Sequence, residues 1–288
     1  MSDCGQWGLS IIAFVGSVFS PYYLFAQRGG RTPAAEDHCA LNVALYSQRA
    51  KRWSMTERGQ RHCARDEHHF KIGPSALHWD GSTLVISIDE VGMPLPHRIR
   101  GTVRIRPEQL FNFSTPLDAA GRHRWGPLAP QSRVEVDLQQ PGQRWQGHAY
   151  LDSNEGDEPI AKAFTEWDWS RGQLKDGSTA VIYDTEPEGL DGRLLVLRFT
   201  PDGRVVPFEA PHSQRLPRTA WRIARRMRSD SPVKVLQQLE DTPFYQRAML
   251  QSTLLGESVT SFHETLNVPR LVSPVVQAML PWRMPRRR

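Results

Sequence analysis

The residues of this chain that could carry out acid chemistry on an apolar molecule gather in one window, residues 121–157. From Arg144 onward this window predicts a strand, in which alternate side chains share a face. One face would then carry four polar or aromatic side chains, namely Gln146, His148, Tyr150 and Asp152. His123 and Trp125 repeat the two-residue spacing upstream. A carboxyl that donates a proton among aromatic faces suits a pocket that protonates an apolar substrate.

The elements that would position these residues are mainly β-strands. The 288 residues include 22 prolines and 21 glycines, and long apolar helical periodicities are few, which favours short strands and turns over helical bundles. Such a chain is long enough for one large domain or two small ones, each with a buried core. The nine tryptophans fit the lining of a hydrophobic ligand cavity, although ordinary packing explains them equally well.

Alternating hydrophobicity predicts individual strands at several places. These places are residues 83–89, 98–105, 133–138, 144–152, 163–169, 178–184 and 193–200. Turn signals separate them at residues 79–81, 141–142, 190–192 and 201–203. Many short strands with regular turns indicate a sandwich or a barrel.

Three further segments complete the organisation. Residues 8–20 are apolar on both faces, which predicts a buried first strand, because no basic residue precedes them as in a signal peptide and they are too short to span a membrane. Contact of this segment with a membrane stays an alternative. Residues 153–159 form a candidate connector between two halves. Residues 233–240 predict a short helix, capped by Ser231 with Pro232 at its first position.

Positive charge concentrates near the C-terminal end. The net charge is +5, residues 215–228 hold six arginines and no acid, and no acidic residue follows Glu264. Basic runs interleaved with Trp, Ile, Met and Leu favour an anionic membrane surface, and the last residues, RMPRRR, predict a surface-docking tail. A nucleic-acid partner is not expected, because no binding module is recognisable. A solvated basic face without a partner is the plain alternative.

Cysteine and histidine usage gives no sign of a disulfide framework or a metal. Cys4, Cys39 and Cys63 are few and scattered, as is typical of a reducing compartment. The run from His62 to His69 contains one cysteine and three histidines, but their spacing matches no zinc pattern. We therefore expect no bound metal and a polar turn at this run.

Several motifs, in the same order along almost the whole chain, resemble the carotenoid 1,2-hydratase family, also called hydroxyneurosporene synthase. They are GSVFSPYY (residues 16–23), DHCALNVALY (37–46), RWSMTERG (52–59), IGPSALHWDG (72–81), GRHRWGPLAP (121–130) and GHAYLDSNEGDEP (147–159). The segment EDTPFYQRAML and the closing LPWRMPR are similar to the C-terminal end of that family.

The resemblance implies a fold and a reaction. The fold would be mainly β and lipocalin-like, with two tandem β-barrel domains, residues 1–155 and 156–288, and a short helix and basic tail at the C-terminal end. The reaction would add water across the terminal C1=C2 bond of an acyclic carotenoid such as neurosporene or lycopene, without any cofactor. The setting would be a phototrophic bacterium, with peripheral association at the cytoplasmic side of the inner membrane and other carotenoid-pathway enzymes as possible partners.

The resemblance also implies a site. The proposed catalytic pattern of the family, a His-x-Trp pair followed by a Tyr-x-Asp pair, falls on His123, Trp125, Tyr150 and Asp152. We expect Trp145 and His148 to contact the substrate. Asp152 would be the acid, because burial among aromatic rings disfavours a carboxylate and raises its pKa.

The rest of the mechanism follows from the chemistry of an alkene. Protonation leaves a tertiary cation at C1, which could lie against Trp125 and Tyr150. Water would then attack C1, and the new carboxylate or His123 would take the surplus proton. His123 could instead only orient Asp152 or the water. The plain alternatives are that Asp152 caps a turn and that His123 and Trp125 only pack at a barrel mouth.

Two other functions compete with this hypothesis. A lipocalin-like barrel could carry an isoprenoid without chemistry, because fold does not establish function. A hydratase or cyclase of the same fold could act on a smaller prenylated compound. An acidic carboxyl inside an apolar site would argue against the carrier.

Overall fold

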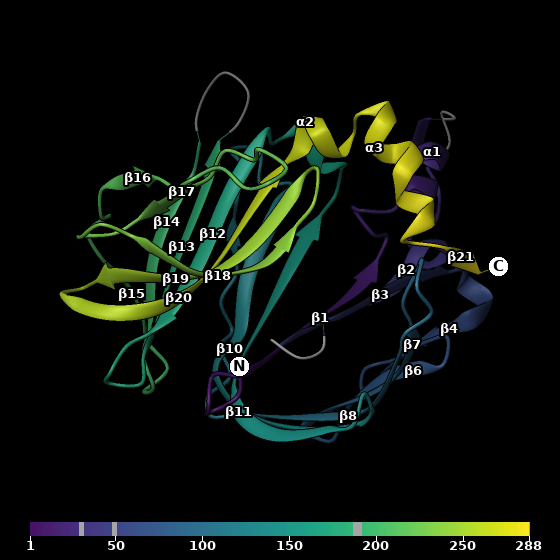
Figure 1. The fold of residues 1–288 in the computed structure, drawn as a ribbon, viewed down its shortest axis with the longest axis horizontal. Helices are drawn as coiled ribbons and strands as arrows, with labels where there is room; N and C mark the ends of the chain where they lie inside the picture. Colours follow the sequence, from purple (N-terminus) through teal and green to yellow (C-terminus); the bar gives the residue numbers. More distant parts are fainter. Residues whose placement is uncertain (29–31, 48–50, 187–191, 288) are drawn as a thin grey trace. The chain divides into compact units, whose positions relative to one another are not determined.

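The computed structural model describes residues 1–28, 32–47, 51–186 and 192–287, and most of them are in strands (Figure 1). The mainly β fold expected from the sequence is therefore confirmed. The chain forms two compact units, each built from separate segments. Unit 1 comprises Met1–Pro107, Ser132–Ala149 and Gln277–Arg288, and unit 2 comprises Glu108–Gln131 and Tyr150–Val276.

This division differs from the expected halves, residues 1–155 and 156–288. The reason lies in two long strands, β10 (His123–Gln140) and β11 (Gln143–Gly156), each of which contributes to both units. Residues 153–156 belong to β11, so the expected connector at residues 153–159 is largely strand. The number of barrels stays a prediction.

Unit 1 contains a sheet of four strands in the order β1-β2-β3-β21. The strands are β1 (Trp7–Val15), β2 (Cys39–Ser47), β3 (Arg52–Arg58) and β21 (Arg286–Arg287). The predicted first strand is therefore confirmed, but most of its residues are half-buried. β2 is the strand buried along its whole length, since its sequence CALNVALYS offers small and apolar side chains on both faces.

A second sheet has the order β11-β10-β8-β7-β6-β5-β4, with β9 (Thr115–Pro116) paired to β10. Its other strands are β4 (Cys63–Arg65), β5 (His69–Ile72), β6 (Ser75–Trp79), β7 (Leu84–Val91) and β8 (Arg98–Pro107). Strands were predicted within β7, β8, β10 and β11. The turn signals at residues 79–81 and 141–142 lie between neighbouring strands, as expected.

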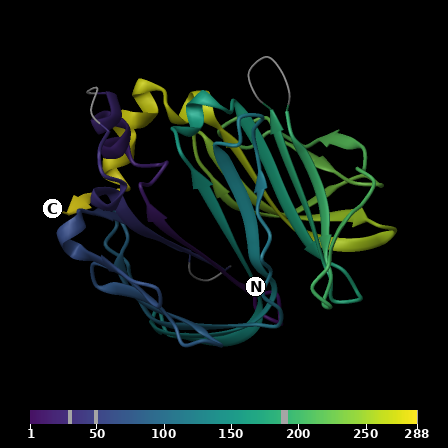
Figure 2. The same ribbon diagram turned by 180° about the vertical axis from the view of Figure 1, so that it is seen from behind.

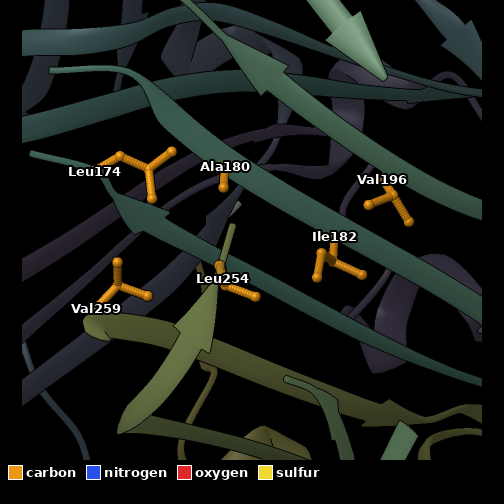
Figure 3. Packing of buried hydrophobic residues seen from close by; sticks show 6 residues of the cluster. All are labelled: Leu174, Ala180, Ile182, Val196, Leu254 and Val259. Carbon is orange, nitrogen blue, oxygen red and sulfur yellow. The ribbon is translucent and has the colours of Figure 1, made fainter. Parts of the chain in front are cut away.

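Unit 2 is built on an antiparallel sheet in the order β15-β14-β13-β12-β20-β19-β18 (Figure 2). Its strands are β12 (Glu166–Gln173), β13 (Thr179–Glu186), β14 (Leu194–Phe199), β15 (Val205–Pro207), β18 (Lys234–Asp241), β19 (Tyr245–Leu254) and β20 (Glu257–Asn267). A two-stranded ribbon adds β16 (Ser213–Arg215) and β17 (Arg226–Arg228). One face of the sheet carries an apolar core that includes Ala180 and Ile182 (Figure 3).

The helix predicted at residues 233–240 is wrong, because this segment is strand β18. β18 pairs with β19 over six residue pairs with two register shifts, so sheet pairing overrides a local pattern compatible with a helical turn. The helices near the C-terminal end are instead α2 (Val268–Leu271) and α3 (Pro274–Met279). Of the turn expected at residues 190–192, residues 190 and 191 lie outside the described part of the chain.

The C-terminal tail is an integrated part of unit 1, not the free docking tail expected from its charge. β21 pairs in parallel with β3. The Arg286 guanidinium contacts the buried Glu57 carboxylate and donates to Asp37 at 2.8 Å. Arg283 lies 4.6 Å from the centre of the Trp53 ring. Acidic partners inside the unit therefore take up charge that the sequence alone suggested was available to lipids.

This arrangement makes Arg286 important for stability. We expect Arg286→Met to lower the free energy of unfolding by about 3 kcal/mol, because it removes the arginine from the Glu57 carboxylate, 3% exposed, and leaves it only the contact with His38 Nδ1 at 2.9 Å. Urea denaturation followed by far-UV circular dichroism would measure this. Arg287→Met, at the exposed neighbour, should change stability by less than about 0.5 kcal/mol. Equal, small effects of both substitutions would contradict the structural role of the tail.

Candidate active site

The candidate site is assembled in unit 2, on one face of the seven-stranded sheet. Opposed residues of antiparallel strands share a face. Arg171 of β12 lies opposite Phe262, and Trp169 lies opposite both Glu264 and Tyr183. β10 supplies Trp125, whose ring contacts Tyr183 of this face. β11 supplies Tyr150, whose ring contacts Trp169, and Asp152, whose carboxyl is influenced by the charges of Arg171 and Glu264.

Asp152 is held by Trp125. The indole Nε1–H donates a 2.9 Å hydrogen bond to Asp152 Oδ2, and Trp125 itself is only 1% exposed. Because Asp152 lies within strand β11, the alternative in which it caps a turn is wrong. The Trp125 ring makes an edge contact with Tyr183, with 5.7 Å between ring centres. The indole therefore fixes both the position of the carboxyl and the identity of the oxygen that remains available, Oδ1.

The proton affinity of Asp152 is raised by its surroundings. Desolvation by the crowding protein atoms raises the pKa of Asp152 to about 6, against the opposing effect of the Trp125 hydrogen bond. The Glu264 charge raises this pKa further, and the Arg171 charge lowers it. By surface area the residue is nevertheless exposed, so its carboxyl is crowded by protein atoms but open to solvent. At pH 7 roughly a tenth of such carboxyls is protonated, so a usable acid exists near neutrality.

Tyr150 lies between aromatic and cationic neighbours. Its ring centre is 5.5 Å from that of Trp169 and 4.9 Å from the guanidinium carbon of Arg171. Its hydroxyl is buried and has no hydrogen-bond partner of normal geometry among the described residues. Burial, followed by the nearby Asp152 charge, raises the pKa of Tyr150 well above its ordinary value. Tyr150 is therefore a neutral phenol at physiological pH.

His123 is buried and has both ring nitrogens engaged. Nδ1 lies 2.9 Å from Asp118 Oδ2, and Nε2 lies 3.1 Å from the Glu158 carbonyl oxygen. Both ring nitrogens therefore face oxygen atoms, and the ring is held between Asp118 and Glu158. The ring also packs against Phe164, 4.9 Å between centres. His123 thus joins the Asp118 turn, β10 and the segment after β11, and this geometry favours its orienting role over a role as base.

Trp145 and His148 belong to unit 1, whereas the other four expected residues belong to unit 2. His148 is exposed, with Nε2 3.1 Å from Arg133 and 3.7 Å from the Asp3 carboxylate. Trp145 is half-buried, and its indole nitrogen has no hydrogen-bond partner among the described residues. Their expected contact with substrate stays a prediction. In the described part of the chain, no three His, Cys, Asp or Glu side chains form a group that could hold a metal ion.

Sequence reasoning missed five residues of this site. They are Asp118, Trp169, Arg171, Tyr183 and Glu264, which touch or electrostatically influence the expected four. Trp169, Arg171, Tyr183 and Glu264 lie in β12, β13 and β20, and only the register of these strands places them on a common face. Asp118 lies five residues before His123 and could have been found as a polar residue in the turn preceding β10.

The fold and the site define a class: a mainly β, lipocalin-like protein with a protonatable carboxyl among aromatic rings. The crystal structure of NE1406 from Nitrosomonas europaea, assigned as an AttH, shares the fold with a TM-score of 0.65 at 13% identity, covering 92% of this chain and 88% of that one. At this low identity the similarity concerns the fold alone.

Sequence comparison identifies the family. The family model for carotenoid hydratase CrtC matches residues 11–288. Acyclic carotenoid 1,2-hydratases are 57% identical in Rubrivivax gelatinosus and 49% in Thiocapsa roseopersicina, over 100% and 99% of this chain and 71% of each relative. The hydratase of Cereibacter sphaeroides is 36% identical over 96% of this chain and 98% of its own length. The chain belongs to the carotenoid hydratase family, enzymes that add water, and the family resemblance seen in its motifs is confirmed.

The two hydrogen bonds of His123 predict a loss of stability on substitution. His123→Gln should lower the free energy of unfolding by about 2 kcal/mol, because the largely buried Asp118 carboxylate loses its partner at His123 Nδ1. The matched control is His148→Gln, an exposed histidine of β11, which should stay within about 0.5 kcal/mol of the parent. Thermal and urea unfolding would compare them. A His123→Gln protein of unchanged stability but without activity would instead indicate direct participation in catalysis.

Proposed function

We propose that this chain adds water across the terminal C1=C2 bond of acyclic carotenoids, such as neurosporene, lycopene and their derivatives, to give 1-hydroxy carotenoids without a cofactor. The observation that carries the proposal is the Asp152 carboxyl, which accepts the Trp125 indole N–H beside aromatic rings and whose pKa is raised to about 6 by desolvation. The relatives are named acyclic carotenoid 1,2-hydratases, which supports the substrate class.

The first step is proton transfer to carbon. Oδ2 accepts the Trp125 N–H, so the transferable proton resides on Oδ1. Transfer to C2 leaves a tertiary cation at C1 and a carboxylate at Asp152, and the Trp125 hydrogen bond stabilises that carboxylate. Arg171 already occupies one side of the Tyr150 ring, so only the opposite side of that ring could face a carbocation.

The second step restores the acid. A water molecule attacks C1, and its surplus proton returns to the Asp152 carboxylate, so that the net change is the addition of one water. His123 is poorly placed to accept this proton, because both its ring nitrogens already face protein oxygen atoms. Its contribution is to hold the start of β10 in register with the end of β11.

A non-catalytic isoprenoid carrier is the rival from another class. It would share the aromatic lining but would gain nothing from a carboxyl that is expensive to desolvate. A hydratase or cyclase acting on a smaller prenylated compound would use the same acid, and only the substrate would differ.

Asp152→Asn should reduce hydration by on the order of 10³-fold, because the amide cannot donate the proton. The assay incubates purified protein with lycopene or neurosporene in liposomes made up in ¹⁸O-enriched water, and mass spectrometry detects one labelled oxygen per hydrated end. In the parent protein, kcat/KM should fall about tenfold per pH unit above pH ~6, because the required acid is the protonated form. Saturable carotenoid binding without any labelled product would establish the carrier instead, and a pH-independent rate would exclude Asp152 as the acid.

We also propose that unit 1 docks peripherally on an anionic membrane at the cytoplasmic side of the inner membrane, where an apolar substrate would dissolve. Helix α1 (Pro21–Arg28) and the C-terminal segment contain no acidic residue. They expose Phe25 (77%), Met279 (44%) and Trp282 (74%) in unit 1. Aromatic residues beside arginines fit a lipid interface. Among the described residues, no helix is long and apolar enough to cross a bilayer. Docking beside other carotenoid-pathway enzymes is part of the same proposal.

The double substitution Phe25→Ser/Trp282→Ser should lower binding to phosphatidylglycerol-containing vesicles at least about tenfold, because each large side chain contributes about 1.5–3 kcal/mol when buried. Vesicle co-sedimentation of the full chain would measure it. Leu110→Ser, at an exposed leucine of unit 2, is the control. Unchanged sedimentation of the double variant would contradict docking through this surface.

A further inference from the structure

Arg171 is a half-buried arginine that lies against two aromatic rings of the site face. Its guanidinium carbon lies 4.9 Å from the centre of the Tyr150 ring and 5.3 Å from that of Phe262. It makes no hydrogen bond or ion pair with any other residue that the structure describes. Burial lowers the pKa of Arg171, so its charge is held at a cost. Buried arginines are ordinarily paired.

The neighbouring Arg247 shows what a structural arginine looks like on the same face. Its Nε donates to Glu264 at 2.7 Å, and Nη1 lies 3.6 Å from Glu240. Glu264 therefore has its own close partner, and Arg171 is not needed to neutralise it. An apolar side chain at position 171 would fill the space between Tyr150 and Phe262 without a desolvation cost. The sequence nevertheless places a cation there.

The position of Arg171 relates it to the acid. It shares the sheet face with Trp169 and Glu264, and it covers the ring of Tyr150, two residues before Asp152 on β11. Arg171 and Glu264 act on the Asp152 charge with opposite signs, and the carboxyl pairs directly with neither among the described residues. Proton donation creates a carboxylate at Asp152, and a cation nearby stabilises that state.

We propose that Arg171 is a positioning residue of hydration: it fixes the ring of Tyr150 by stacking and, against Glu264, sets the charge balance under which Asp152 gives up its proton. This inference rests on the proposed function, with Asp152 as the acid. It assigns two separable contributions to one side chain. The planar guanidinium positions Tyr150, and the positive charge favours the carboxylate of Asp152.

The charge contribution predicts that the pH above which kcat/KM falls (the high-pH limb) moves in opposite directions in Arg171→Gln and Glu264→Gln. In Arg171→Gln, the high-pH limb of kcat/KM should move upward by about one pH unit, because Asp152 then holds its proton more tightly. The rate below pH 5 should fall at least about tenfold, because the conjugate carboxylate has lost its cation. In Glu264→Gln, the limb should move downward. Arg198→Gln, at an arginine of unit 2 that pairs with Asp176, is the control and should leave the limb in place.

Arg171→Lys separates the two contributions. Lysine keeps the charge but lacks the planar guanidinium that stacks on an aromatic ring. The limb should therefore stay near that of the parent, while kcat falls because Tyr150 is less firmly held. Loss of kcat with an unmoved limb in Arg171→Gln would overturn the charge contribution. Full activity of Arg171→Lys would overturn the stacking contribution.

Folding and function can be distinguished with Arg171→Met. Because the guanidinium has no ion pair to lose, this variant should unfold at the same temperature as the parent or higher, yet hydrate poorly. A strongly reduced unfolding temperature would assign Arg171 a structural role and overturn the proposal.

A readout without substrate keeps this inference distinct from the proposed function. Carbon-13 NMR of aspartate-labelled protein can follow the carboxyl signal of Asp152, assigned by its absence in Asp152→Asn. Its titration midpoint should move upward in Arg171→Gln and downward in Glu264→Gln. If these shifts occur but no carotenoid is hydrated, the proposed function fails and the charge balance stands. If hydration occurs and the midpoints are unchanged, the inference fails alone.

Discussion

The hydrogen bond from the Trp125 indole to Asp152 is the interaction on which the rest of the site depends. A carboxyl crowded by protein atoms tends to stay protonated, and without a fixed partner it would be free to rotate. The indole donates to one oxygen at 2.9 Å and leaves the other for chemistry. Since indole can only donate, it favours the carboxylate state and keeps the acid from becoming too weak. The Trp125 hydrogen bond therefore influences both the position of the Asp152 carboxyl and its acid strength.

This bond requires that two strands keep their register where they enter unit 2. Trp125 is near the start of β10, and Asp152 is near the end of β11. The His123 ring bonds to Asp118 on one side and to the Glu158 carbonyl on the other, so it ties the two strand ends together. His123 and Trp125, although only two residues apart, therefore have different roles. His123 stabilises the two strand ends, and Trp125 holds the Asp152 carboxyl.

Local patterns predicted several of the strands, and the family resemblance supplied the four expected site residues, but neither predicted the residues that surround those four. Alternation in residues 144–152 identifies β11 because a half-buried strand repeats every two residues. Residues 233–240 gave the wrong element, since the pairing of β18 with β19 is not encoded locally. Arg171 and Glu264 are 93 positions apart in the chain, by subtraction of their numbers. They meet on one face only through the register of β12 and β20. The partners of Arg286 could not be predicted for the same reason, because Glu57 and Asp37 lie far from it in the chain.

An alkene-protonating acid faces two opposing demands. It must hold a proton at the pH of the cell, which favours a high pKa, and it must release that proton to carbon, which favours a low one. Burial and Glu264 act in the first direction on Asp152, and Trp125 and Arg171 act in the second. A carboxyl with burial alone would be well protonated but inert, and one with a direct arginine partner would be ionised and useless. Arg171 influences the Asp152 charge without a hydrogen bond to the carboxyl among the described residues, which gives an intermediate result. On the proposed mechanism, this balance is the reason for a half-buried cation without an ion pair at a position where an apolar side chain would cost less.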